Sequence, residues 1–111
     1  MLFRSDGVII LRLGGRIVGI AGGELREVIE QQLETAPESP KFLFDFAGVS
    51  RMDSSGLGTL IGLHVSIARK QGRIGVINVS RSINNLLVIG RLVTTFERFE
   101  TEEEAIAALN G

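Results

Sequence analysis

The chain has 111 residues, of which 44% are hydrophobic and 23% are charged, so it is long enough for one hydrophobic core and too short for two. Its formal net charge is -1, which argues against a nucleic-acid partner, because binding to phosphates calls for clustered Lys and Arg. There is no cysteine, which excludes a disulfide framework, a thiolate metal site and a cysteine nucleophile.

Hydrophobic stretches in the sequence are short. None approaches the roughly 18 apolar residues of a membrane span, and residues 1–7 lack the long apolar region of a secretory leader. We therefore expect one domain over residues 1–111 that is cytoplasmic and does not insert into a membrane.

The N-terminal residues predict a β-hairpin followed by a glycine-rich connection. Asp6-Gly7 is a two-residue turn signal between Leu2-Phe3 and the β-branched run 8–13. Residues 14–23 then predict a flexible connection to a helix. A phosphate-binding loop is the less favoured interpretation, because neither G-x-G-x-x-G nor G-x-x-x-x-G-K-[ST] occurs there, but whether it binds a nucleotide stays open.

A surface helix and a buried strand come next. The helix has apolar residues at helical spacing, namely Leu25, Val28, Ile29 and Leu33, and residues 35–40 end it because they contain two prolines. The apolar run 42–47 predicts the strand, with Asp45 as its one charge. Asp45 could serve acid–base chemistry with Asp53, but we favour a structural role in which it accepts hydrogen bonds from nearby N–H groups.

The motif M-D-S-S-G-L-G at residues 52–58 stands where this strand gives way to a helix. Asp53, Ser54 and Ser55 are all good N-cap residues, and the first helical turn offers unpaired N–H groups and a partial positive charge. A phosphate could be held at this place.

Periodicity predicts a helix from this motif to Gln71, with Gly72 as its C-cap. The predicted apolar stripe consists of Leu57, Leu60, Ile61, His64 and Ala68, widened by Leu63 and Ile67. Gly58, Gly62 and Ser66 form a row of small side chains on another face, which lets a second backbone come close. That backbone belongs either to this chain or to a partner.

His64 is the one histidine, and ten residues of helix place it ~15 Å from Ser54, too far for a serine–histidine pair. A single nitrogen ligand does not make a metal site. We therefore predict no catalytic residue and no metal site.

The remaining chain predicts a crossover to a strand at 73–79, a short helix that carries Ile83 and ends at Gly90, an edge strand within 92–99, and a last helix capped by Thr101. Together these elements predict an α/β fold: a mixed sheet of four or five strands with about four helices.

The order of these segments resembles the STAS domain, in particular the bacterial anti-sigma factor antagonists. The resemblance rests on D-S-S-G-L-G after an apolar strand, on the following I-G-L-H-V-S-I-A-R-K-Q-G, and on the later S-R-S-I-N-N-L-L, and it covers nearly the whole chain. One departure is Gly15-Arg16-Ile17-Val18, which stands where antagonists commonly carry a G-x-L-D-like element.

The resemblance implies a function. The protein would bind an anti-sigma factor that is also a serine kinase, would be phosphorylated by it on Ser54 and restored by a protein phosphatase, and would itself be no enzyme and need no cofactor. The implied partner-binding residues are Asp53, Ser54, Ser55, Gly56, Gly58, Gly62 and Ser66.

Two other functions remain open. One is a structural STAS subunit of a sensory or membrane transport-associated complex, with an unmodified serine and possible self-association as a homodimer. The other is a small nucleotide-binding or nucleotide-hydrolysing enzyme that uses the glycine-rich residues 14–23.

Overall fold

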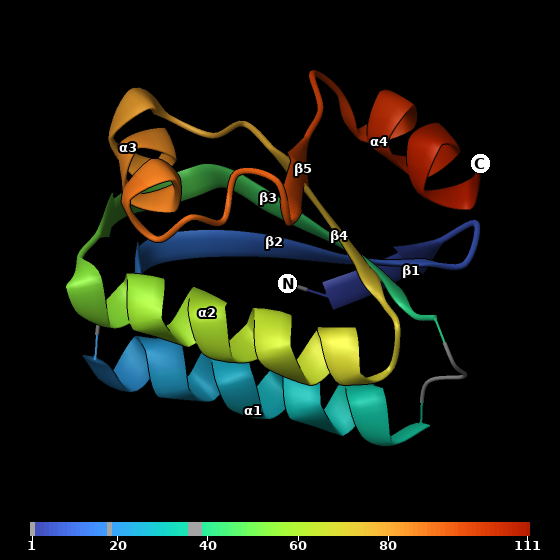
Figure 1. The fold of residues 1–111 in the computed structure, drawn as a ribbon, viewed down its shortest axis with the longest axis horizontal. Helices are drawn as coiled ribbons and strands as arrows, with labels where there is room; N and C mark the ends of the chain where they lie inside the picture. The colour runs from blue at the N-terminus through green and yellow to red at the C-terminus, as the bar shows by residue number, and fades with distance from the viewer. Residues whose placement is uncertain (1, 18, 36–38) are drawn as a thin grey trace.

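A computed structural model describes residues 2–17, 19–35 and 39–111 (Figure 1). Its elements in chain order are β1 (Leu2–Ser5), β2 (Val8–Ile17), α1 (Gly19–Thr35), β3 (Lys41–Met52), α2 (Ser54–Arg69), β4 (Arg73–Ile77), α3 (Arg81–Ile89), β5 (Phe96–Arg98) and α4 (Glu102–Asn110). The predicted α/β class, with a mixed sheet and four helices, is confirmed.

The five strands form one sheet in the order β1-β2-β3-β4-β5. β1 pairs antiparallel with β2, and every later neighbour is parallel, because each connection crosses over through a helix. The predicted hairpin turn is confirmed: Asp6 and Gly7 have φ values of 50° and 80°, the left-handed pair that a two-residue turn requires.

Helices cover both faces of the sheet. α1, α2 and α3 pack on one face, around a core that includes Phe42, Phe44 and Leu60. α4 packs on the other face, where Ala105 and Leu109 meet Val8, Ile10 and Leu43. Figure 1 shows α1 and α2 lying side by side beneath the sheet, with α4 on the opposite side.

The prediction of a glycine-rich connection at residues 14–23 is wrong for the described residues. Val18, which belongs to the predicted connection, lies outside them. Residues 14–17 continue β2, with Gly14 paired to Gly48 and Ile17 to Met52, and α1 already begins at Gly19. β3 is longer than the predicted 42–47 for the same reason, because its second half pairs with the end of β2. β2 and β3 therefore extend as a two-stranded ribbon beyond β4, which pairs only with residues 41–45 of β3.

The register of this ribbon shifts twice. Arg12 faces Asp45 while Gly14 faces Gly48, and Gly15 faces Val49 while Arg16 faces Arg51, so β3 carries the additional residue each time. Such bulges bend and twist a strand.

The other predicted strands are too long. β4 ends at Ile77, because Asn78 turns into the left-handed region with φ 58°. β5 keeps only three of the predicted residues 92–99, since Leu92 and Thr95 form turns after α3.

The predicted core stripe of α2 is partly wrong. Leu57, Leu60, Leu63 and Ile67 are buried, whereas Ile61 and Ala68 are exposed and His64 is half-buried. Val28 of α1, also predicted to face the core, is exposed.

The end of α2 differs in detail from the prediction. Gln71, with φ 58°, takes the left-handed position, and the Gly72 N–H donates to the Ile67 carbonyl at 3.0 Å. Gly72 is needed for space instead: a Cβ there would stand 2.7 Å from the Pro40 carbonyl oxygen.

Candidate functional site

A single residue, Asp53, connects β3 to α2 and caps the helix. Its carbonyl accepts the Leu57 N–H at 2.9 Å, and its Oδ1 accepts the Gly56 N–H at 3.1 Å. This is N-cap geometry, so Asp53 alone of the three candidate caps has that role. Ser54 and Ser55 are the first two helical residues, and their side chains lie outside the described part of the structure.

Ser54 begins a helical row whose described members, at positions 58, 61 and 65, face outward; we call positions 54, 58, 61 and 65 the outward row. At about 100° per residue, positions 54, 58, 61 and 65 share one side of a helix. Gly58, Ile61 and Val65 of this row are exposed, while the buried Leu60, Leu63 and Ile67 lie on the other side of the helix.

The predicted row of small residues does not form one continuous surface. Gly58 is exposed, and a Cβ there would meet no described atom within 4 Å. Gly62 lies beside α1 of the same chain, where its Cβ would stand 3.5 Å from Nη1 of Arg26. Ser66 is half-buried, and Gly56 is buried. Of these four residues, Gly58 is therefore the one that leaves open room for a partner backbone.

Asp45 has the structural role that we favoured. It is buried, and its Oδ1 accepts the Ala47 N–H at 2.9 Å and the Asn78 side-chain amide at 2.9 Å. Arg12 lies 3.6 Å from its other oxygen. These contacts tie β2, β3 and the end of β4 together, and they hold the carboxylate as an acceptor, which leaves the alternative of acid–base chemistry without support.

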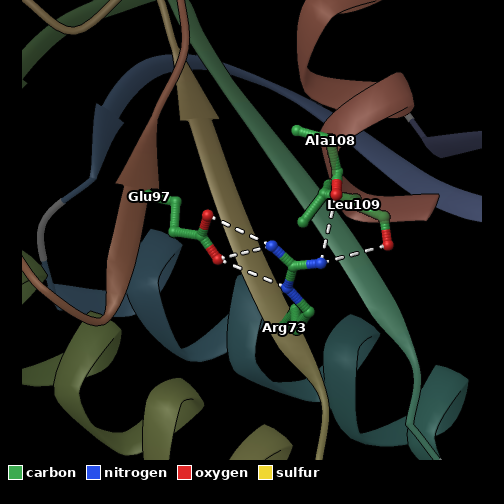
Figure 2. A network of polar contacts seen from close by, with 4 residues as sticks. All are labelled: Arg73, Glu97, Ala108 and Leu109. Carbon is green, nitrogen blue, oxygen red and sulfur yellow. Dashed lines mark hydrogen bonds and ion pairs between the residues drawn. The ribbon is translucent and has the colours of Figure 1, made fainter. Parts of the chain in front are cut away.

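A polar network not foreseen from the sequence fixes β5 and α4 to β4 (Figure 2). The Arg73 guanidinium donates to both Glu97 oxygens, at 2.9 and 3.2 Å through Nη2, and to the carbonyls of Ala108 and Leu109 at 3.1 and 3.4 Å. Nothing in the sequence signalled this bidentate contact, because its partners are 24 or more residues away in the chain.

The described residues contain no group of three or more His, Asp or Glu side chains placed to hold a metal ion. Within the same ranges, no helix is both long enough and apolar enough to cross a membrane.

The fold and the site together define a class of protein: an α/β domain in which a central strand passes through an Asp cap directly into a helix that begins Ser-Ser-Gly. The STAS domain model matches residues 2–105, and the chain belongs to this family, as the sequence resemblance predicted.

Individual relatives agree with this assignment. The chain is 25% identical over 103 residues to an anti-sigma F factor antagonist of Paenibacillus polymyxa, covering 93% of this chain and 87% of that protein. The Bacillus cell fate determinant SpoIIAA, solved in its phosphorylated form, is similar with a TM-score of 0.77 and 25% identity, over 97% of this chain and 96% of the other. An anti-sigma factor antagonist of Mycobacterium paratuberculosis shares the fold with a TM-score of 0.84 at 22% identity, over 100% and 92% of the two chains.

Proposed function

We propose that this STAS domain is an anti-sigma factor antagonist and that phosphorylation of Ser54 switches it off. In its unmodified form it binds an anti-sigma factor with serine kinase activity in the cytoplasm, so that the sigma factor is released. The kinase phosphorylates Ser54, and a protein phosphatase restores the serine. The domain is a substrate in this cycle, contributes no catalytic residue and needs no cofactor.

The observation that carries the proposal is the division of roles at the start of α2. Asp53 supplies the cap, so a phosphoryl group on Ser54 removes no capping hydrogen bond. The N-terminal end of a helix also tolerates negative charge. Phosphorylation at this place is therefore compatible with the folded domain.

The switch then acts on the surface. A phosphoryl group adds about 1.5 to 2 negative charges and three acceptor oxygens. It changes the charge and bulk at the head of the outward row, so a partner docked over it is lost by repulsion and desolvation. Asp53, Ser54, Ser55 and Gly58 line this surface in the proposal, while Gly56, Gly62 and Ser66 support its shape.

The relatives support the proposal by their names. One is called an anti-sigma F factor antagonist, and the structure of another describes a phosphorylated form. We assign the anti-sigma factor as the target, and phosphorylation as the modification, on the basis of this similarity and of the position of Ser54.

The test is a pull-down from a lysate of the native host with wild type, Ser54→Ala and Ser54→Asp as baits. Wild type and Ser54→Ala should recover an anti-sigma factor of the kinase type, and Ser54→Asp should not. With the purified partner and ATP, wild type should gain one phosphoryl group on the peptide that contains Ser54, and Ser54→Ala should gain none.

Two results would contradict the proposal. Equal recovery of the same partner by all three baits would show that charge at Ser54 does not control binding. Recovery of a large sensory or membrane-associated assembly in place of an anti-sigma factor would indicate a structural subunit.

A further inference from the structure

The C-terminal end of α3 exposes an unusual set of aliphatic side chains. Val88 and Ile89 are 54% and 72% exposed, and Val93, just beyond the helix, is 47% exposed. Ile83 and Leu87 already supply the buried side of this helix. Single exposed aliphatic residues need no explanation, but several within six positions of one surface segment indicate an interaction site. We call Val88, Ile89 and Val93 the α3 patch.

The α3 patch lies next to the first turn of α2. Gly90, between Ile89 and Val93 in the chain, lies against Leu57, since a Cβ at Gly90 would stand 2.9 Å from Leu57 Cδ1. Leu57 follows Ser54 by three residues, which is less than one helical turn. The first turn of α2 and the C-terminal end of α3 are therefore neighbours in the fold.

Along the chain, the charge between Asp53 and Glu97 is one-sided. Residues 54–96, which form α2, β4, α3 and the start of β5, contain no Asp or Glu, so every acidic residue of the chain lies outside them. The same segment carries Arg69, Lys70, Arg73, Arg81 and Arg91. Arg73 is paired with Glu97, but Arg81 and Arg91 are exposed at the two ends of α3.

From these observations we infer that the α3 patch, together with Arg91, is a docking surface for an apolar patch with acidic side chains on the anti-sigma factor. This inference rests on the proposed function and names the chemistry of its partner. Charge complementarity selects the acidic partner, because α3 and the residues that flank it, 78–96, carry Arg81 and Arg91 and no Asp or Glu, although Asp53 lies at the start of α2.

The same chemistry gives a direction to the switch. A phosphoryl group on Ser54 introduces negative charge at the border of a surface that receives an acidic partner. The resulting like-charge repulsion destabilises the complex and leaves the fold of the antagonist unchanged.

The experiment measures the affinity of the purified anti-sigma factor, recovered by the wild-type bait, for defined variants of the full chain by titration calorimetry. Ile89→Ser combined with Val93→Ser should bind at least about tenfold more weakly, as expected for central apolar contacts. Arg91→Glu should also weaken binding and reduce its dependence on salt. Val28→Ser, which removes an exposed valine on α1, and Arg4→Glu on β1 are the matched controls and should stay within about twofold of wild type.

Each alternative outcome is decisive. If the Ile89/Val93 variant binds as tightly as wild type while Ser54→Asp does not bind, the inference fails and the proposed function stands. If sedimentation shows that the same variant separates a wild-type dimer but keeps its affinity, the patch serves a second copy of the chain and the inference fails. If wild type binds no anti-sigma factor, both are overturned.

Discussion

Leu57, in the first turn of α2, lies directly against Gly90, the C-cap of α3. Gly90 has φ -80° and ψ 0°, a conformation open to any residue, so the constraint on a side chain here comes from the space that Leu57 occupies and not from backbone geometry. Gly90→Ala should displace the buried Leu57 side chain and lower the free energy of unfolding by about 1 to 2 kcal/mol. Urea denaturation measures this as a lower midpoint with an unchanged slope. An unchanged midpoint would show that Leu57 yields without cost.

Gly58→Ala is the matched change in open space. A Cβ at Gly58 meets no described atom within 4 Å, and the residue lies in the interior of α2. Alanine should therefore raise the free energy of unfolding by about 0.5 to 1 kcal/mol through helix propensity alone. Loss of stability in the same denaturation experiment would mean that the position is not open.

Gly72→Ala should be the most damaging of the glycine substitutions. The added Cβ would stand 2.7 Å from the Pro40 carbonyl oxygen and 2.5 Å from Ile67 Cγ2, and the backbone atom cannot rotate away. We expect a loss of about 2 to 3 kcal/mol, measured by thermal or urea denaturation. A loss below that of Gly90→Ala would contradict this packing argument.

Asp53 and Ser54 should differ sharply in their effect on stability. Asp53→Ala removes the cap and should cost about 1 kcal/mol, whereas Asp53→Asn keeps an acceptor oxygen and should cost less. Ser54→Ala should change the free energy of unfolding by no more than about 0.5 kcal/mol, because Ser54 is not the cap. If Ser54→Ala proves the more destabilising variant, the division of roles at the start of α2 is wrong.

Arg73 should hold the C-terminal helix in place. Its guanidinium reaches two α4 carbonyls as well as Glu97, so Arg73→Ala should cost more than Glu97→Ala, although both side chains are about 40% exposed and the ion pair alone is weak. We expect about 1 kcal/mol for Arg73→Ala. Hydrogen exchange should become faster in α4 for this variant and remain unchanged in α2. Equal effects of the two variants would assign the whole contribution to the ion pair.

Much of the fold could be predicted from local chemistry. Asp6-Gly7 specified the hairpin, and Thr101 caps α4 as the T-x-x-E pattern predicted, accepting the Glu104 N–H at 3.1 Å. The strand ends could not be predicted, because Gly14 and Gly15 indicate a loop in isolation, and only their pairing with the second half of β3 makes them part of a strand.

The core face of α2 was mispredicted for a different reason. The helix is apolar on both sides, so periodicity alone does not separate the buried Leu63 from the exposed Ile61. The α3 patch was missed for the same reason. Leu87 and Ile89 are both aliphatic residues of one helix, and only the packing of Leu87 against the core makes it the buried one.

For the site, sequence supplied the position of Ser54 but not its surroundings. The cap could be any of three adjacent residues by type, and the choice of Asp53 follows from where β3 stops. The contacts of Asp45 with Arg12 and Asn78 join residues that are distant in the chain and close only in the parallel sheet.

The separation of charge described for residues 54–96 has a kinetic meaning as well. With no carboxylate within residues 78–96, Arg81 and Arg91 give the α3 side of the molecule a local positive potential. In the field of an acidic partner such a molecule rotates before contact, so a larger fraction of collisions begins in the productive orientation. Because this field decays over about 8 Å at physiological ionic strength, the orientation is imposed only in the last moments of approach.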